Sequence, residues 1–224
     1  MRTQIDAVFV GGVRPMPGDG RPTGFFKQAV RGAVAVGAEG LTGDHQADRR
    51  VHGGPEKAIH HFPAENLARL ALVFPGQAAQ FIPGGMGENI STRGWTEAEV
   101  CIGDVYRLGS ARIQLGQPRS PCWKIDARHG AEGITEYVHE HGIAGWYYRV
   151  LTTGAVAAGD DIELLERNPV PVTLSEYWKL LHTHRPTAVE LLRVIDTPGL
   201  APRIRERLRQ RLQWLRENSA LAGD

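Results

Sequence analysis

The sequence predicts an α+β protein with a mainly β, barrel-like core over residues 1–167 and a small three-helix bundle over residues 168–224. In the first part, short apolar runs alternate with glycine-rich turns, which is typical of many short strands. The chain has 27 glycines in 224 residues, well above the usual share of about 7%. After Asn168-Pro169-Val170-Pro171 the strand patterns stop. Many short strands with few helices favour a barrel-like core.

Apolar and aromatic residues between turn signals mark the strands of the first part. Six segments fit this pattern: residues 5–10, 57–62, 105–108, 111–116, 146–151 and 162–165. Helical spacing after Pro63 predicts a helix that carries Leu67, Leu70, Ala71 and Phe74. A capping-box pattern at residues 96–99 predicts a short turn, and residues 135–141 predict a further helix that ends at Gly142.

Three helices make up the predicted bundle. The first starts with the capping box Thr173-Leu174-Ser175-Glu176. The second begins near Pro186 and ends before Thr197-Pro198. The third begins near Pro202 and carries one apolar stripe, which consists of Leu200, Ile204, Leu208, Leu212 and Leu215. We expect these helices to pack on the barrel or on a partner.

The third helix is rich in arginine, which would suit phosphate binding. We interpret these arginines instead as a solvated face whose stems cover apolar surface, because they spread around the helix without aromatic residues between them. They are Arg203, Arg205, Arg207, Arg209, Arg211 and Arg216. The formal net charge of +1 gives no overall field that attracts polyanions or membranes. Direct binding to nucleic acid or to a membrane is therefore not expected.

Cysteine usage and the first residues indicate a reduced, cytoplasmic protein. Two cysteines, Cys101 and Cys122, cannot form a disulfide framework. Residues 1–6 lack the apolar core of a secretion signal. The most apolar helical stretch, residues 67–74, is far shorter than the ~20 residues that a membrane span needs.

Residues 40–58 are dense in glycine, histidine and charged residues and contain little to bury. The adjacent Gly53 and Gly54 allow a ligand or a strand to approach the backbone closely. His52 and Lys57, together with two neighbouring arginines, could hold an anion. The histidines of this region match no standard zinc spacing. His60 and His61 would point to opposite faces of a strand, so only one of them can join a site.

Cys122 lies in a loop that two prolines stiffen, Pro118 and Pro121. A stiff loop can hold a ligand side chain still. Arg119 and Lys124 flank the cysteine, and nearby positive charge favours the thiolate, the form that binds soft or redox metals. Cys101 lies in an apolar run and is expected to be a small buried side chain.

These stretches, in this order, resemble the MOSC domain, the module named for the C-terminal part of molybdenum-cofactor sulfurases. The matching motifs are Gly43-Asp44-His45-Gln46, His52-Gly53-Gly54-Pro55-Glu56-Lys57-Ala58, Gly87-Glu88-Asn89, Ile102-Gly103-Asp104 and Gln117-Pro118-Arg119-Ser120-Pro121-Cys122. The likeness covers most of residues 1–167. The tail resembles the three-helix extension of a standalone bacterial subgroup that is linked to hydroxylaminopurine resistance.

The resemblance implies a barrel that binds the pterin molybdenum cofactor, with Cys122 as the cysteine that coordinates molybdenum. It also implies reduction of N-hydroxylated substrates such as hydroxylaminopurine and other base analogues. Arg119, Lys57 and His52 would then hold the pterin phosphate or orient the metal ligands. Gly53, Gly54 and Asn89 would line the pterin. The chain lacks the pyridoxal-phosphate domain of the full sulfurases, so sulfuration of the cofactor is not expected, and recombinant protein can lack the cofactor.

A reduction needs electrons from another molecule. Two cysteines cannot ligate a four-thiolate iron–sulfur cluster, and the sequence has no dinucleotide fingerprint. We therefore expect a separate reductase partner, and no haem, flavin or iron–sulfur cluster in this chain. Two alternatives stay open: a non-catalytic carrier of the cofactor, and a carrier of persulfide sulfur on Cys122. Both a monomer and a homodimer are compatible with the sequence.

Overall fold

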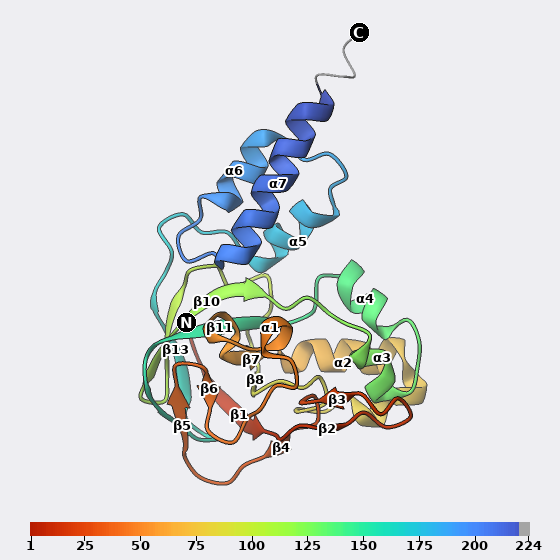
Figure 1. The fold of residues 1–224 in the computed structure, drawn as a ribbon. Coiled ribbons are helices and arrows are strands. Elements are labelled where there is room, and N and C mark those ends of the chain that lie inside the picture. Colours follow the sequence, from red (N-terminus) through yellow and green to blue (C-terminus); the bar gives the residue numbers. More distant parts are fainter. Residues whose placement is uncertain (220–224) are drawn as a thin grey trace.

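The computed structural model describes residues 1–219, so residues 220–224, the end of the predicted bundle segment, lie outside the described part. Within residues 1–219, seven strands form a closed barrel in the order β13-β9-β10-β11-β7-β8-β1 (Figure 1). Pairing of β1 with β13 closes the barrel, and the short β7–β8 contact is parallel while the other pairs are antiparallel. The strands are β1 Arg2–Val10, β7 Ile59–His61, β8 Ile90–Thr92, β9 Val105–Leu108, β10 Ala111–Pro118, β11 Trp146–Thr152 and β13 Asp161–Glu166. The predicted barrel-like core is confirmed.

Alternation of side chains along the strands explains how the barrel fills its interior. On β10, Ala111, Ile113 and Leu115 are fully buried, whereas the intervening Arg112 is exposed. The register with β11 shifts at the following Gly116, where an added Cβ would lie 3.0 Å from the guanidinium of Arg149. This irregularity lies near the end of β10, close in sequence to the loop that carries Cys122.

Short peripheral strands escaped the sequence analysis because two to four residues are too few for a clear alternation. A three-stranded sheet has the order β12-β5-β6, and a hairpin pairs β2 with β3. β4 pairs with the end of β1. Their bounds are β2 Arg14–Pro15, β3 Pro22–Thr23, β4 Gln28–Ala29, β5 Val34–Gly37, β6 Gly40–Leu41 and β12 Gly154–Val156.

Several short helices surround the barrel. The two helices predicted in this part are confirmed as α2 Ala64–Val73 and α4 Ile134–Glu140. The strand predicted from residue 57 is too long, because Pro55–Lys57 forms a 3-10 turn and β7 begins at Ile59. Three further elements were not predicted from the sequence: α1 Arg49–His52, the 3-10 segment Pro75–Gln80 and α3 Lys124–His129.

The C-terminal segment forms three helices at one end of the barrel (Figure 1), α5 Leu174–His182, α6 Ala188–Ile195 and α7 Pro202–Ser219. A capping box opens α5 as predicted, and Thr187 with Glu190 forms a second box at α6. Buried side chains of the barrel and of these helices belong to one apolar cluster. The domain division at residue 167 stays a prediction. No helix of the described chain combines the length and apolarity that crossing a bilayer requires.

Candidate functional site

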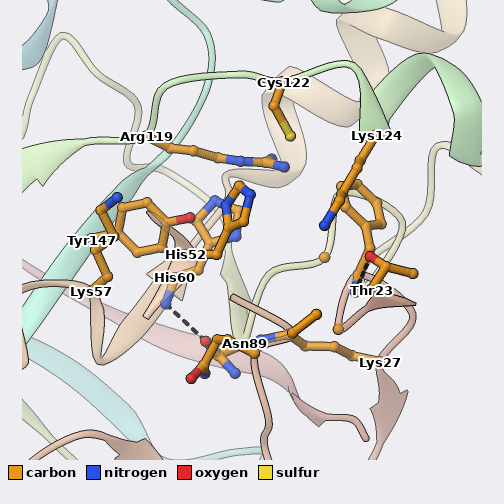
Figure 2. Close-up of a pocket in the computed structure, with 15 residues that line it drawn as sticks. Thr23, Lys27, His52, Lys57, His60, Asn89, Arg119, Cys122, Lys124 and Tyr147 are labelled. Atoms are coloured by element: carbon orange, nitrogen blue, oxygen red, sulfur yellow. Dashed lines mark hydrogen bonds between the residues drawn. The ribbon is translucent and has the colours of Figure 1, made fainter. Parts of the chain in front are cut away.

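A cleft of about 540 Å³, counted with its open mouth, lies where the loop after β10 faces the segments around β3, α1 and β7 (Figure 2). Five of the seven predicted site residues line it: His52, Lys57, Asn89, Arg119 and Cys122. The other residues that line the cleft are Thr23, Gly24, Phe25, Lys27, Gln46, Ala47, His60, Gly87, Lys124 and Tyr147. The fold therefore brings together the histidine-rich stretch, the Gly87-Glu88-Asn89 turn and the cysteine loop, which are far apart in the sequence.

Cys122 is half-buried, and its sulfur points into the cleft toward the guanidinium of Arg119 (Figure 2). Its carbonyl accepts hydrogen bonds from the amide of Ile125 at 3.0 Å and from the hydroxyl of Thr135 at 3.2 Å. These bonds tie the cysteine to the start of α3. Cys101, by contrast, is 2% exposed, and its burial raises the pKa of its thiol. Of the two thiols, only that of Cys122 is open to the cleft.

Arg119 is a buried cation without a counter-ion. Its side chain is 6% exposed, and its guanidinium lies 5.5 Å from the ring centre of Phe25. Within the described chain its Nη1 has no hydrogen-bond partner, and it forms no ion pair. The backbone amide is fixed by a 3.0 Å bond to the carbonyl of Gly145. Because an unpaired buried charge is costly, this guanidinium is suited to an anionic ligand.

His60 and Tyr147 are register partners on β7 and β11, and their rings lie 5.0 Å apart at the cleft. His60 Nε2 is buried and has no hydrogen-bond partner among the described residues. Burial, together with the charges of Arg119 and Lys27, lowers the pKa of His60 well below its usual value. The imidazole is therefore neutral, and its Nε2 can donate a hydrogen bond to a ligand or accept one from it, depending on the tautomer.

His61 points to the opposite face, as the alternation of a strand predicts. Its two ring nitrogens contact the hydroxyls of Tyr148 at 3.0 Å and Thr92 at 2.9 Å. Burial lowers its pKa to about 3. Only one histidine of the adjacent pair thus reaches the cleft.

Burial of His61 makes stability depend on pH. Because its pKa falls from 6.5 to about 3 on folding, the unfolded chain binds more protons between these values, and stability is lost as the pH falls below 6.5. In the His61→Gln variant, the slope of the unfolding free energy against pH should be smaller by up to roughly 1.4 kcal/mol per pH unit. Urea unfolding between pH 4.5 and 7.5 measures it. An unchanged slope in the variant would contradict the assignment.

His52 and Lys57 close the side of the cleft next to α1. Burial and the charges of Lys124, Lys57 and Arg119 lower the pKa of His52 to about 4, so it is neutral at pH 7. Burial and the charge of Arg203 lower the pKa of Lys57. The Lys57 ammonium donates to the carbonyl of Val51.

Asn89 lines the cleft, but the protein already uses its amide. Its Nδ2 donates to the carbonyl of Phe9 at 3.1 Å and to Asp44 at 3.0 Å, while its Oδ1 accepts from the amide of His60 at 2.9 Å. Asp44 also pairs with Lys27 at 2.7 Å. Asn89 therefore holds the cleft wall in place, and a ligand would meet its surface rather than free polar atoms.

Gly53 and Gly54 do not line the cleft. An added Cβ on Gly53 would lie 2.9 Å from Oε1 of Gln46 and 3.2 Å from Cα of Arg49. The close approach at this glycine thus comes from the protein itself. Gly54 has a φ of +86°, which explains why a glycine begins the turn before Lys57.

The cleft has a strongly cationic lining. Among the described residues, Lys27, Lys57, Arg119 and Lys124 line it and no carboxylate does. Lys27 and Tyr147 were missed, and the sequence left open which residue of the pair His60 and His61 reaches the cleft. A lone lysine in a loop gives no sequence signal, and only the pairing of β7 with β11 places His60 next to Tyr147. Within residues 1–219, no three His, Cys, Asp or Glu side chains form a group that could hold a metal ion.

Residues 48–163 match the family described as the MOSC domain. The chain belongs to the MOSC domain family. It is 40% identical over 167 residues to protein YiiM of Escherichia coli strain K12, a match that covers 75% of this chain and 74% of YiiM. MOSC domains are associated with binding of the molybdenum cofactor, which suits the cationic cleft.

Solved structures extend the likeness beyond the matched residues. Crystal structures of YiiM from Escherichia coli and from Geobacillus stearothermophilus each have a TM-score of 0.80, at 30% and 28% identity. They cover 95% and 94% of this MOSC chain, and 93% and 99% of their own chains. The shared fold therefore includes most of the C-terminal helices. A relative named "Reductase" from Gibberella moniliformis is 35% identical over 161 residues, which make up 71% of this chain and only 28% of that protein.

Proposed function

We propose that this MOSC protein binds the pterin molybdenum cofactor in the cleft and reduces N-hydroxylated compounds of the hydroxylaminopurine type. One observation carries the proposal: the thiol of Cys122 points toward a buried guanidinium, Arg119, that lacks a counter-ion (Figure 2). Thiolate is a suitable ligand for a redox metal, and the guanidinium is a suitable partner for a phosphate.

The residues of the cleft fit this cofactor. Nη1 of Arg119 and Nε2 of His60 are buried polar atoms without partners, as expected where a ligand completes the hydrogen bonding. Cys122 would supply a thiolate ligand to molybdenum. Arg119, Lys57 and His52 would hold the anionic part of the cofactor. Since no cluster of His, Cys, Asp or Glu side chains within residues 1–219 could complete a metal site, the remaining metal ligands would come from the cofactor itself.

The proposed reaction converts an N-hydroxylamine, two electrons and two protons into an amine and water. The bound cofactor supplies the two-electron redox chemistry. The protein's own side chains would position the reactants: Cys122 would hold the metal, Arg119 would hold the phosphate, and the neutral His60 would offer a hydrogen bond to a ligand in the cleft. Tyr147 packs against His60.

Electrons would come from a separate reductase. The relative named "Reductase" supports this, because the region similar to our chain fills only 28% of that protein. Turnover by the purified chain with a nicotinamide cofactor as the sole reductant would contradict this part of the proposal.

The proposal is tested on protein purified from a host that makes the cofactor. Molybdenum is measured by mass spectrometry, pterin by the fluorescence of its oxidised form, and turnover with hydroxylaminopurine and chemically reduced methyl viologen, which replaces the unknown donor. Stoichiometric molybdenum with turnover supports the reductase. Molybdenum without turnover of any N-hydroxylated compound favours the carrier of cofactor, and a persulfide on Cys122 in metal-free protein favours the sulfur carrier.

Replacing Arg119 separates ligand binding from folding. We expect Arg119→Gln to weaken cofactor retention by about 10- to 100-fold, because a charge-assisted hydrogen bond is worth roughly 1.5–3 kcal/mol. The cofactor-free variant should be as stable as the cofactor-free parent protein, since the substitution removes an unpaired buried charge. Pterin content and urea unfolding measure the two effects.

The matched control for this experiment is Arg112→Gln, on the strand β10 that precedes the loop of Arg119, and its exposed guanidinium pairs with Glu166 at 2.6 Å. It should keep its pterin. Strong destabilisation of the cofactor-free Arg119→Gln protein would show instead that the guanidinium serves the fold.

A further inference from the structure

Two guanidinium groups lie on one aromatic ring beside the cleft. The guanidinium carbon of Arg14 is 3.8 Å from the ring centre of Phe26, and that of Arg128 is 4.8 Å from it. Neither guanidinium donates a hydrogen bond or forms an ion pair within the described residues. Burial, with the like charge of Arg14, lowers the pKa of Arg128. The two like charges therefore repel each other, and no carboxylate of residues 1–219 forms an ion pair with either of them.

A neighbouring arginine shows what an ordinary surface arrangement looks like in this fold. Arg21 is stacked on Trp123 at 3.8 Å, the same distance as Arg14 on Phe26. Unlike Arg14, it has a carboxylate partner, Asp19, at 2.5 Å. Stacking on an aromatic ring thus does not by itself leave a guanidinium unpaired. Of the three guanidinium groups stacked on Phe26 and Trp123, those of Arg14 and Arg128 keep their hydrogen-bonding capacity free within the described residues.

The pair is continuous with the cleft. Phe25 lines the cleft and its ring meets that of Phe26 edge-on at 6.4 Å. Lys124 also lines the cleft and precedes Arg128 by four residues on α3, which places both on one side of the helix. The hairpin β2–β3 lies beside α3 (Figure 1), where the Lys124 ammonium is 3.5 Å from the carbonyl of Pro22. Lys124 at the cleft and Arg128 at Phe26 therefore place positive charge on the side of α3 between the cleft and Phe26.

We propose that Arg14 and Arg128 bind a phosphate group of the substrate, so that N-hydroxylated purine nucleotides, rather than free bases, are the preferred substrate class. Guanidinium groups donate paired hydrogen bonds to phosphate oxygens, and two of them offset a dianion. Arg119, Lys57 and His52 line the cleft and would hold the cofactor's own phosphate, whereas Arg14 is exposed and lies outside the cleft lining. The substrate part of this inference rests on the proposed reductase function. The phosphate group is unchanged in the reaction.

The phosphate chemistry is tested without any cofactor or turnover. Inorganic pyrophosphate is titrated into the full chain while NMR follows the Nε–H signals of Arg14 and Arg128. We expect saturable shifts of these signals and of the backbone amide of Phe26 in the parent chain and in the matched control Arg21→Gln. The shift of the Phe26 amide should disappear in the Arg14→Gln/Arg128→Gln double variant. Shifts that fail to saturate, or that are absent, overturn the phosphate subsite.

The source of the phosphate is tested by turnover. With reduced methyl viologen as donor, kcat/KM is measured for hydroxylaminopurine and for its ribonucleoside 5′-triphosphate. We expect the nucleotide to be favoured by about tenfold or more, and this ratio to fall by about tenfold in the double variant but not in Arg21→Gln. An unchanged ratio with lower pterin content would mean that the pair holds the cofactor, which overturns the substrate assignment. Turnover of neither compound would overturn the proposed function, while the pyrophosphate titration still decides the subsite.

Discussion

The Cys122→Ser variant is expected to contain only background molybdenum and to lose turnover by at least about a thousandfold, equivalent to roughly 4 kcal/mol of barrier. Serine has nearly the same shape, but its hydroxyl stays protonated at neutral pH and is a poor ligand for a redox metal. The loop should keep its conformation, because the bonds that fix it are made by the backbone carbonyl of Cys122 to Ile125 and Thr135. Metal analysis, turnover and thermal unfolding are measured on the same preparations.

Cys101→Ser provides the matched control, since this second thiol is 2% exposed and lies away from the cleft. It should retain molybdenum and turnover. Full molybdenum and activity in Cys122→Ser would end the assignment of this cysteine as metal ligand. Retained molybdenum with lost activity would instead indicate that the thiol takes part in the reaction without holding the metal.

The elements that local patterns predicted well are those with strong short-range signals. The capping box at Thr173 begins α5, and the apolar residues after Pro63 form α2. The strand predicted from residue 57 started too early because the apolar run does not reveal the 3-10 turn at Pro55–Lys57. A proline at the start of such a turn is compatible with several local conformations.

The site was predictable where its residues lie in compact motifs and not where the fold assembles them. Cys122 and Arg119 belong to one proline-stiffened loop, so their proximity follows from the sequence. Lys27 reaches the cleft only because Asp44, from another loop, neutralises it inside the protein. Such a pairing over 17 residues leaves no periodic pattern to detect. For Gly53 the sequence left open a ligand or a protein segment as the close neighbour, and in the structure Gln46 takes that position.

Breaking the Lys27–Asp44 pair should have the largest effect on stability. The two side chains are 7% and 1% exposed, and burial lowers the pKa of Lys27 while Asp44 opposes that shift. Asp44 also accepts hydrogen bonds from Gly11 N at 3.1 Å and from Asn89 at 3.0 Å. We expect Asp44→Asn to lower the free energy of unfolding by about 3–5 kcal/mol, because it leaves a buried ammonium without a counter-ion. Urea unfolding of cofactor-free protein at pH 7 measures this.

Two further variants identify the cause of that loss. Asp48→Asn removes a nearby carboxylate whose partner Arg50 is 90% exposed, so it should cost less than about 1 kcal/mol. Lys27→Met/Asp44→Asn removes both charges and should be more stable than Asp44→Asn alone. Removing both charges of a buried pair costs less stability than leaving one of them buried without a partner. If the double variant is no more stable than the single one, the hydrogen bonds of Asp44 to Gly11 and Asn89 carry the effect. In that case the Asp44 carboxylate supports the cleft through its hydrogen bonds with the backbone amide of Gly11 and the side-chain amide of Asn89. Lys27 would then be a cation that a bound anion can neutralise.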